Sequence, residues 1–165
     1  MKEISPETSC FICKNRHEDV RQLALQASKY PDVNMAEAVV QIAGWQIAEK
    51  KIPLWAQTEG VRYPQHLSME QCSSEVTARY KASLVKGDSF ADLTAGLGVD
   101  FSFIARNFNQ ADYVERQEVL CELAQHNFPL LGLNHVRIHQ ADGTEFLKNN
   151  ETSRLFCFLI QLSRQ

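Results

Sequence analysis

The residues best suited to chemistry lie in one short stretch, residues 92–100, and in an acid that follows it. Gly96 and Gly98 stand two positions apart in that stretch, and glycine takes backbone conformations that let a main chain approach a ligand closely. Glu115 follows the glycines by the roughly 20 residues expected between a nucleotide-binding loop and an acid that accepts ribose hydroxyls. A loop and an acid in this order predict a nucleoside site. The alternative is a tight turn followed by a solvated glutamate.

The neighbouring segments have the patterns of the elements that must position these residues. Residues 89–93 are short and mostly apolar, as expected of a buried strand, and residues 111–115 predict a second strand that ends in Glu115. The first turn of a helix between them would offer unpaired N–H groups to polar or anionic atoms. Apolar residues recur there at helical spacing, namely Phe101, Ile104, Ala105 and Phe108. The order strand, glycine loop, helix, strand, acid is that of a nucleoside-binding half-site.

Three features narrow the class of ligand. The dinucleotide fingerprint has a third glycine where the helix packs on the strand, and Phe101 occupies that position here. A phosphate-binding P-loop is excluded because no Lys-Ser or Lys-Thr pair follows the glycines. Asp92, at the end of the first strand, suits a ligand with a cationic end better than a pyrophosphate. A nicotinamide-dependent oxidoreductase is therefore disfavoured.

Residues 92–100, which read DLTAGLGVD, resemble motif I of the class I S-adenosylmethionine-dependent methyltransferases, and Glu115 resembles their ribose-binding acid. Residues 69–81 followed by this loop are more closely similar to the THUMP-like RNA methyltransferase family of Bacteroidetes-type bacteria. The resemblance implies an α/β fold, in which a helical N-terminal region precedes the first half of a Rossmann-like class I methyltransferase sheet with strand order 3-2-1-4. It divides the chain into a helical accessory region, residues 1–66, and a partial cofactor domain, residues 67–165.

The resemblance also implies a cofactor, S-adenosylmethionine, and assigns residues to it. Asp92 and the backbone of Gly96 and Gly98 are expected to hold its methionine portion, and Glu115 its ribose. Asp142 is expected to accept a hydrogen bond from the adenine amino group; the alternative is an ordinary turn aspartate before a glycine. The full set of expected cofactor residues is Asp92, Thr94, Gly96, Gly98, Asp100, Glu115 and Asp142.

The segment ahead of the first strand, residues 68–86, is predicted to be helical. It carries four polar residues that the resemblance places at the methionine end of the cofactor or at the substrate, namely Gln71, Ser73, Ser74 and Thr77. The alternative is a helix-capping cluster with Thr77 facing solvent. Val76, Tyr80 and Leu84 share one apolar stripe of this segment at spacings of four.

Residues 154–162 predict the fourth strand, after which the family has an Asp-Pro motif beside the transferred methyl group. The chain reaches Gln165 without that motif, so we expect a truncated domain that keeps the cofactor half-site and lacks the catalytic motif. Catalytic residues stay unassigned, and a non-catalytic cofactor-binding or assembly module is the alternative function. Both faces of residues 154–162 are apolar, and an uncovered apolar edge strand predicts self-association.

Two further segments complete the predicted sheet domain. A long helix is expected over residues 117–131, with Asn127 solvated or capping. Residues 136–139 alternate between apolar and polar side chains like a half-buried strand. The helix face expected to contact the sheet consists of Val119, Leu120, Leu123, Ala124 and Phe128.

The N-terminal region predicts short helices that pack without doing chemistry. The best of them spans residues 35–51, with Asn34 as its cap. Residues 55–66 predict a loop, in which Trp55 and Tyr63 either stack on unpaired bases or anchor the loop to the core.

The cysteines, the net charge and the apolar runs indicate which metals, partners and location to expect. Cys10 and Cys13 predict a buried or half-buried thiol pair rather than a zinc site, because only His17 lies near them as a further ligand, and we expect no metal. Five scattered cysteines predict free thiols. The net charge of −3, from 17 basic and 20 acidic residues, counts against tight RNA binding by this chain alone. With no membrane-spanning apolar run and no signal-peptide core, the expected location is cytoplasmic.

Overall fold

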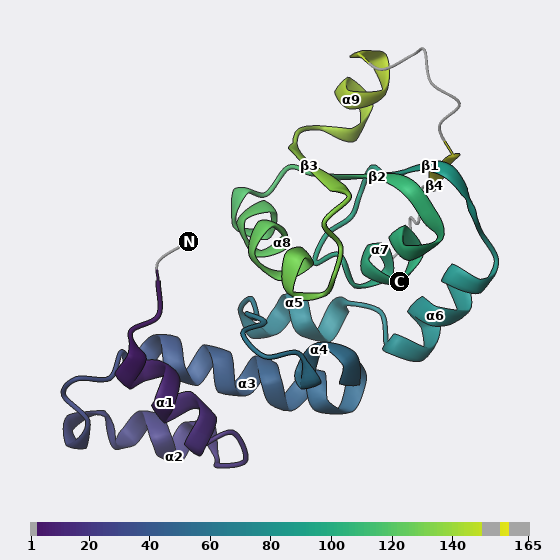
Figure 1. The fold of residues 1–165 in the computed structure, drawn as a ribbon. Coiled ribbons are helices and arrows are strands. Elements are labelled where there is room, and N and C mark those ends of the chain that lie inside the picture. Colours follow the sequence, from purple (N-terminus) through teal and green to yellow (C-terminus); the bar gives the residue numbers. More distant parts are fainter. Residues whose placement is uncertain (1–2, 150–155, 159–165) are drawn as a thin grey trace. The chain divides into compact units, whose positions relative to one another are not determined.

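The computed structural model of the chain describes residues 3–149 and 156–158, and Figure 1 shows its elements in chain order. The chain divides into two compact units, Met1–Gln71 and Cys72–Gln165. Among the described residues, no helix is long and apolar enough to cross a membrane. The same residues contain no group of three or more His, Cys, Asp or Glu side chains that could hold a metal ion.

The N-terminal unit consists of helices that begin at residues able to cap them. Ser5, Asp19 and Asn34 each accept a hydrogen bond from a backbone N–H in the first turn of the helix that follows. The predicted helix over residues 35–51 and its Asn34 cap are confirmed. The core is formed by Phe11, Leu23, Met35, Ala38 and Ile42. The elements are α1 (Pro6–Lys14), α2 (Val20–Leu25), a 3₁₀ turn (Ala27–Lys29), α3 (Met35–Lys51), α4 (Pro53–Gln57) and α5 (His66–Gln71).

The segment predicted as a loop over residues 55–66 begins inside helix α4. Pro53 occupies the first position of that helix, where a backbone N–H would have no acceptor within the helix. Trp55 is fully buried, and Tyr63 is 5% exposed. The Gln41 side chain donates to the Tyr63 carbonyl at 3.0 Å and accepts from the Tyr63 N–H at 2.9 Å. Both rings therefore anchor the segment to the helical core, and the alternative that they stack on bases is wrong for this structure.

The thiols of Cys10 and Cys13 are exposed on α1, so the prediction of a buried or half-buried pair is wrong. The buried face of this helix carries Thr8 and Phe11 instead. A short helix with few apolar residues gives little indication of which side faces inward. Cys10, Cys13 and Cys121 are free thiols, as predicted.

The second unit is a parallel sheet with the strand order β3-β2-β1-β4, which confirms the predicted order. Asp92, the last residue of β1, pairs with Tyr113 of β2, and Glu115, the last residue of β2, pairs with Gln140 of β3. This register brings the carboxyl ends of three strands to one edge, where open α/β sheets bind ligands. The elements are α6 (Glu75–Ser83), β1 (Gly87–Asp92), α7 (Val99–Ile104), a 3₁₀ turn (Ala105–Asn107), β2 (Phe108–Glu115), α8 (Glu118–Leu130), β3 (Val136–Gln140), α9 (Gly143–Asn149) and β4 (Phe156–Phe158).

The fourth strand is described only over Phe156–Phe158, where it pairs in parallel with β1. The other residues of the predicted strand 154–162 lie outside the described residues. In the sheet as described, β4 is an edge strand next to β1.

Aromatic side chains form the core on one face of the sheet. Phe101 of α7 stacks on Phe90 and Phe128, with ring centroids 5.5 and 5.4 Å apart, and meets Tyr113 edge-on at 5.5 Å. Phe108 stacks on Phe90 at 5.2 Å as the first residue of β2, so its predicted position in the helix is wrong. The helix ends earlier because a 3₁₀ turn leads directly into the strand. A second cluster of buried apolar residues consists of Ala91, Leu93, Val114 and Phe146.

The apolar stripe predicted on the segment before β1 faces outward. Val76, Tyr80 and Leu84 are 79%, 65% and 61% exposed, whereas Ala78 and Ala82 are buried. Small side chains on the inner face allow α6 to pack closely on α7, and the larger ones lie on the outer face.

Helix α8 departs from its predicted pattern at two positions. Val119 was expected to contact the sheet but is exposed, and Asn127 was expected to be solvated or capping but is buried. Leu120, Leu123, Ala124 and Phe128 are buried as predicted. The buried arc of α8 thus includes one polar residue, which periodicity in apolar residues does not detect.

Candidate functional site

The glycine loop between β1 and α7 takes the backbone conformation that its sequence predicts. Gly96 and Gly98 have φ angles of 56° and 82°, in the left-handed region that favours glycine. A Cβ on Gly98 would lie 2.9 Å from a ring atom of Phe128 and 3.1 Å from one of Tyr113. Gly98 is therefore required both by its φ angle and by the aromatic core beneath the loop.

Glu115 joins the end of β2 to this loop. Its Oε2 accepts the Gly96 N–H at 3.0 Å, and its Oε1 accepts the N–H groups of Arg116 and Gln117 at 2.8 and 2.9 Å. A carboxylate has about four acceptor positions, so one position remains, on Oε2. The carboxylate can thus take one ligand hydroxyl without losing a backbone bond, and a second hydroxyl would have to share or replace one.

A pocket of about 330 Å³ lies at the carboxyl edge of the sheet beside Glu115. It brings together three of the predicted cofactor residues, Thr94, Glu115 and Asp142. Among the residues that the structure describes, its lining consists of Leu93, Thr94, Glu115, Arg116, Gln117, Asp142, Gly143, Thr144 and Leu147. Its size and its mixture of polar and apolar walls are typical of a small-molecule site.

Asp142 lines the pocket and directly precedes α9. Its Oδ1 accepts the Thr144 N–H at 2.8 Å and the Glu145 N–H at 3.4 Å. Hydrogen bonds from Thr144 hold the pKa of the Asp142 carboxyl below its ordinary value. Gly143 is a pocket residue that the sequence reasoning missed, and a Cβ there would lie 2.6 Å from the Leu93 carbonyl. Its requirement for a small residue depends on Leu93, which follows β1 and lies 50 residues away in the sequence.

Asp92 lies beneath the loop and does not line the pocket. It is 3% exposed, and its Oδ1 accepts the Thr94 N–H at 3.0 Å. Burial raises the pKa of Asp92 to about 6; the charges of Asp100 and Glu115 add to this, while the Thr94 bond and Lys81 oppose it. Asp92 therefore interacts electrostatically both with the pocket and with the residues around Asp100.

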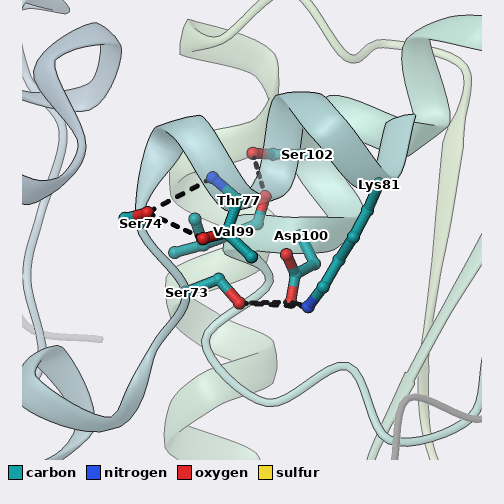
Figure 2. Close-up of polar contacts among 7 residues, drawn as sticks. All are labelled: Ser73, Ser74, Thr77, Lys81, Val99, Asp100 and Ser102. Atoms are coloured by element: carbon teal, nitrogen blue, oxygen red, sulfur yellow. Dashed lines mark hydrogen bonds and ion pairs between the residues drawn. The ribbon is translucent and has the colours of Figure 1, made fainter. Parts of the chain in front are cut away.

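Asp100 is held by a polar cluster on the α6 side of the loop, drawn in Figure 2. Its Oδ2 accepts the Ser73 hydroxyl at 2.6 Å and the Lys81 ammonium at 2.8 Å, and Lys81 Nζ also donates to Ser73 Oγ at 3.2 Å. Lys81 comes from α6, and Ser73 from the segment just before it. Lys81 was missed from sequence because only the packing of α6 on α7 brings it to Asp100.

The remaining predicted contacts before β1 have local partners or belong to the other unit. Ser74 caps α6, since its Oγ accepts the Thr77 N–H at 3.2 Å, and its hydroxyl also bonds that of Thr77 at 2.9 Å. Thr77 is exposed, as in the capping alternative. Gln71 ends the N-terminal unit and is exposed.

Tyr113 is a further residue that sequence reasoning missed. Its hydroxyl donates to the Gly96 carbonyl, and its ring packs against Phe101 and Phe128. Glu115 thus binds the N–H of Gly96, and Tyr113 binds the C=O of the same glycine. The loop is fixed by β2 before any ligand enters.

Comparison with known proteins finds a similar fold in a solved structure. The chain is similar to a crystal structure of a "putative methyltransferase" from Porphyromonas gingivalis W83, with a TM-score of 0.72 and 28% sequence identity. The similarity covers 90% of this chain and 39% of that chain, so this chain spans about two fifths of the length of the solved structure. No protein-family model and no curated protein match the chain. The chain therefore has N-terminal helices and a parallel α/β sheet that match part of a methyltransferase-like structure.

Proposed function

We propose that the sheet unit binds S-adenosylmethionine and that the protein's reaction is methyl transfer. The observation that carries the proposal is the pocket in which Glu115, bonded to the glycine loop, occurs together with Asp142. In the proposed complex, Glu115 accepts a ribose hydroxyl and Asp142 accepts the adenine amino group. Thr94 contributes to the pocket wall.

The charges around the loop support a cationic ligand. Asp92, Asp100 and Glu115 supply three carboxylates, and the charges of Asp100, Lys81 and Glu115 all act on Asp92. S-adenosylmethionine combines a sulfonium with an amino acid and has a net positive charge, whereas the pyrophosphate of a nicotinamide dinucleotide is negative. Coulomb attraction therefore favours the sulfonium ligand at this site.

The chemistry that the bound cofactor would supply is an electrophilic methyl group on sulfur. The chain's own contribution is orientation, because fixing donor and acceptor in line removes much of the entropic barrier to transfer. The loop is suited to this role, since Glu115 and Tyr113 hold both backbone groups of Gly96. RNA is the proposed acceptor on the strength of the sequence resemblance, and a non-catalytic cofactor-binding module is the alternative.

Calorimetric titration of the 165-residue chain with S-adenosylmethionine, S-adenosylhomocysteine and NAD tests the proposal. We expect saturable binding of the first two and none of NAD. Preferential binding of NAD, or no binding of any of the three, would contradict it. Transfer of a labelled methyl group to bulk RNA is a separate measurement, which distinguishes an active methyltransferase from a non-catalytic module.

A further inference from the structure

The Ser73–Lys81–Asp100 cluster leaves one hydrogen-bond donor and one hydrogen-bond acceptor unused. Lys81 has three N–H donors, of which two are directed to Asp100 and Ser73. Asp100 uses only its Oδ2, and its Oδ1 is buried without a hydrogen-bond partner among the described residues. One ammonium donor and one carboxylate oxygen therefore remain available beside the glycine loop.

The environment of these groups makes their unused capacity costly. The side chains of Lys81 and Asp100 are only 16% and 18% exposed. A buried acceptor without a donor is unfavourable, and a partly buried ion pair contributes little net stability. The terminal torsion of an aspartate is broad, so the carboxylate can turn its unpaired oxygen toward an incoming donor.

Position and charge indicate what would use this capacity. Asp100 is the second residue of α7, which begins where the glycine loop ends, and Thr94 at the other end of the loop lines the pocket. An α-amino-acid end has an ammonium, which can donate to a carboxylate, and a carboxylate, which can accept from an ammonium. The cluster offers the complementary pair, as Figure 2 shows for Lys81 and Asp100.

We infer that Lys81 and Asp100 form the recognition pair for the α-amino-acid end of the cofactor, with Lys81 taking the carboxylate and Asp100 the ammonium. This inference rests on the proposed function. Ser73 is a positioning residue, because its hydroxyl bonds both members of the pair. A purely structural role, in which the pair only joins α6 to α7, makes a different prediction for ligands that lack the amino acid.

The test compares S-adenosylhomocysteine with 5′-methylthioadenosine, which keeps the adenosine and the thioether but has no amino-acid end. Lys81→Met removes the ammonium, and Asp100→Asn, which is isosteric, removes the carboxylate charge. In either variant we expect the affinity for S-adenosylhomocysteine to fall 10-fold or more, while the affinity for 5′-methylthioadenosine changes less than 2-fold. Arg79→Met is the matched control, because Arg79 is an exposed cation of the same helix paired with Glu75.

Each outcome decides the inference. Equal losses for the two ligands, or no loss for either, would overturn it in favour of a structural role, and so would the same selectivity in Arg79→Met. Should Lys81→Met fail to fold, as judged by circular dichroism, the isosteric Asp100→Asn decides alone. Wild-type chain that binds neither ligand would refute the proposed function itself, and with it this inference; the wild-type titration thus separates the two failures.

Discussion

Replacing Asp92 with asparagine tests whether the carboxylate beneath the glycine loop is maintained at a cost in stability. Asp92 is 3% exposed, and burial raises its pKa from 3.8 to about 6. Since its pKa in the folded state lies above the unfolded value, the fold favours the protonated form. The corresponding stabilisation is fully present below pH 3.8 and is lost as the pH rises through about 6.

The size of the effect follows from the two pKa values. A change from 3.8 to about 6 corresponds to about 3 kcal/mol of unfolding free energy lost between acid and neutral pH. About 1.3 kcal/mol of this loss is expected between pH 5 and pH 7. Asparagine has the same shape and keeps an oxygen for the Thr94 N–H, but it does not titrate.

Urea unfolding of both proteins at pH 5 and pH 7, followed by circular dichroism, measures the difference. The unfolding free energy of Asp92→Asn minus that of the wild type should rise by about 1.3 kcal/mol between the two pH values. Asp88→Asn is the control, because Asp88 is an exposed acid of the same strand, and the change for Asp92→Asn should exceed the change for this control. A flat or falling difference for Asp92→Asn would refute the burial argument. If the stabilised variant also loses affinity for S-adenosylmethionine, the charge serves binding at the expense of stability.

Three further substitutions test the loop and the sheet edge. Gly98→Ala should lower the unfolding free energy by about 1–3 kcal/mol, and by more than Gly132→Ala does. Both glycines have positive φ, but only Gly98 has ring atoms within 3.1 Å of the added Cβ. Equal losses in denaturant titrations would show that contact with these rings adds no cost. Tyr113→Phe removes the hydroxyl that holds the Gly96 carbonyl, and we expect about 1 kcal/mol weaker binding of S-adenosylhomocysteine by calorimetry; unchanged affinity would show that the loop does not need this bond. Phe158→Lys places a charge on edge strand β4, and we expect less self-association in light scattering; a wild-type chain that stays monomeric at high concentration would contradict the premise.

The part of the fold that the sequence predicts best is the part governed by neighbouring residues. The strand that ends at Asp92, the positive φ angles of Gly96 and Gly98, and the strand that ends at Glu115 all follow from local pattern. The sheet order followed from the resemblance to a doubly wound fold rather than from local pattern, and the structure confirms it.

Several of the failed predictions concern which side of an element faces inward. The stripe at Val76, Tyr80 and Leu84 has helical spacing, yet alanines form the inner face of α6. Periodicity shows that residues share a face, but only tertiary packing decides where that face points.

The site residues that the sequence did not reveal also depend on tertiary packing. Lys81 and Tyr113 act through groups of Asp100 and Gly96, which lie 19 and 17 residues away in the sequence. No local motif marks a lysine whose partner lies on another helix, or a core tyrosine whose hydroxyl holds a loop carbonyl. The pocket role of Gly143 likewise becomes visible only once Leu93, the residue after β1, lies against the start of α9.

Calorimetry on three variants tests whether Glu115 holds the ribose of S-adenosylmethionine, as proposed. Glu115→Ala should weaken S-adenosylmethionine binding by about 1.5–3 kcal/mol, the range for hydrogen bonds to a charged group. Glu118→Ala removes an exposed acid three residues further on and should leave the affinity unchanged. Glu115→Gln, which keeps one acceptor oxygen for the Gly96 N–H, should fall between the two. Equal affinity of wild type and Glu115→Ala would remove Glu115 from the site and contradict its proposed role.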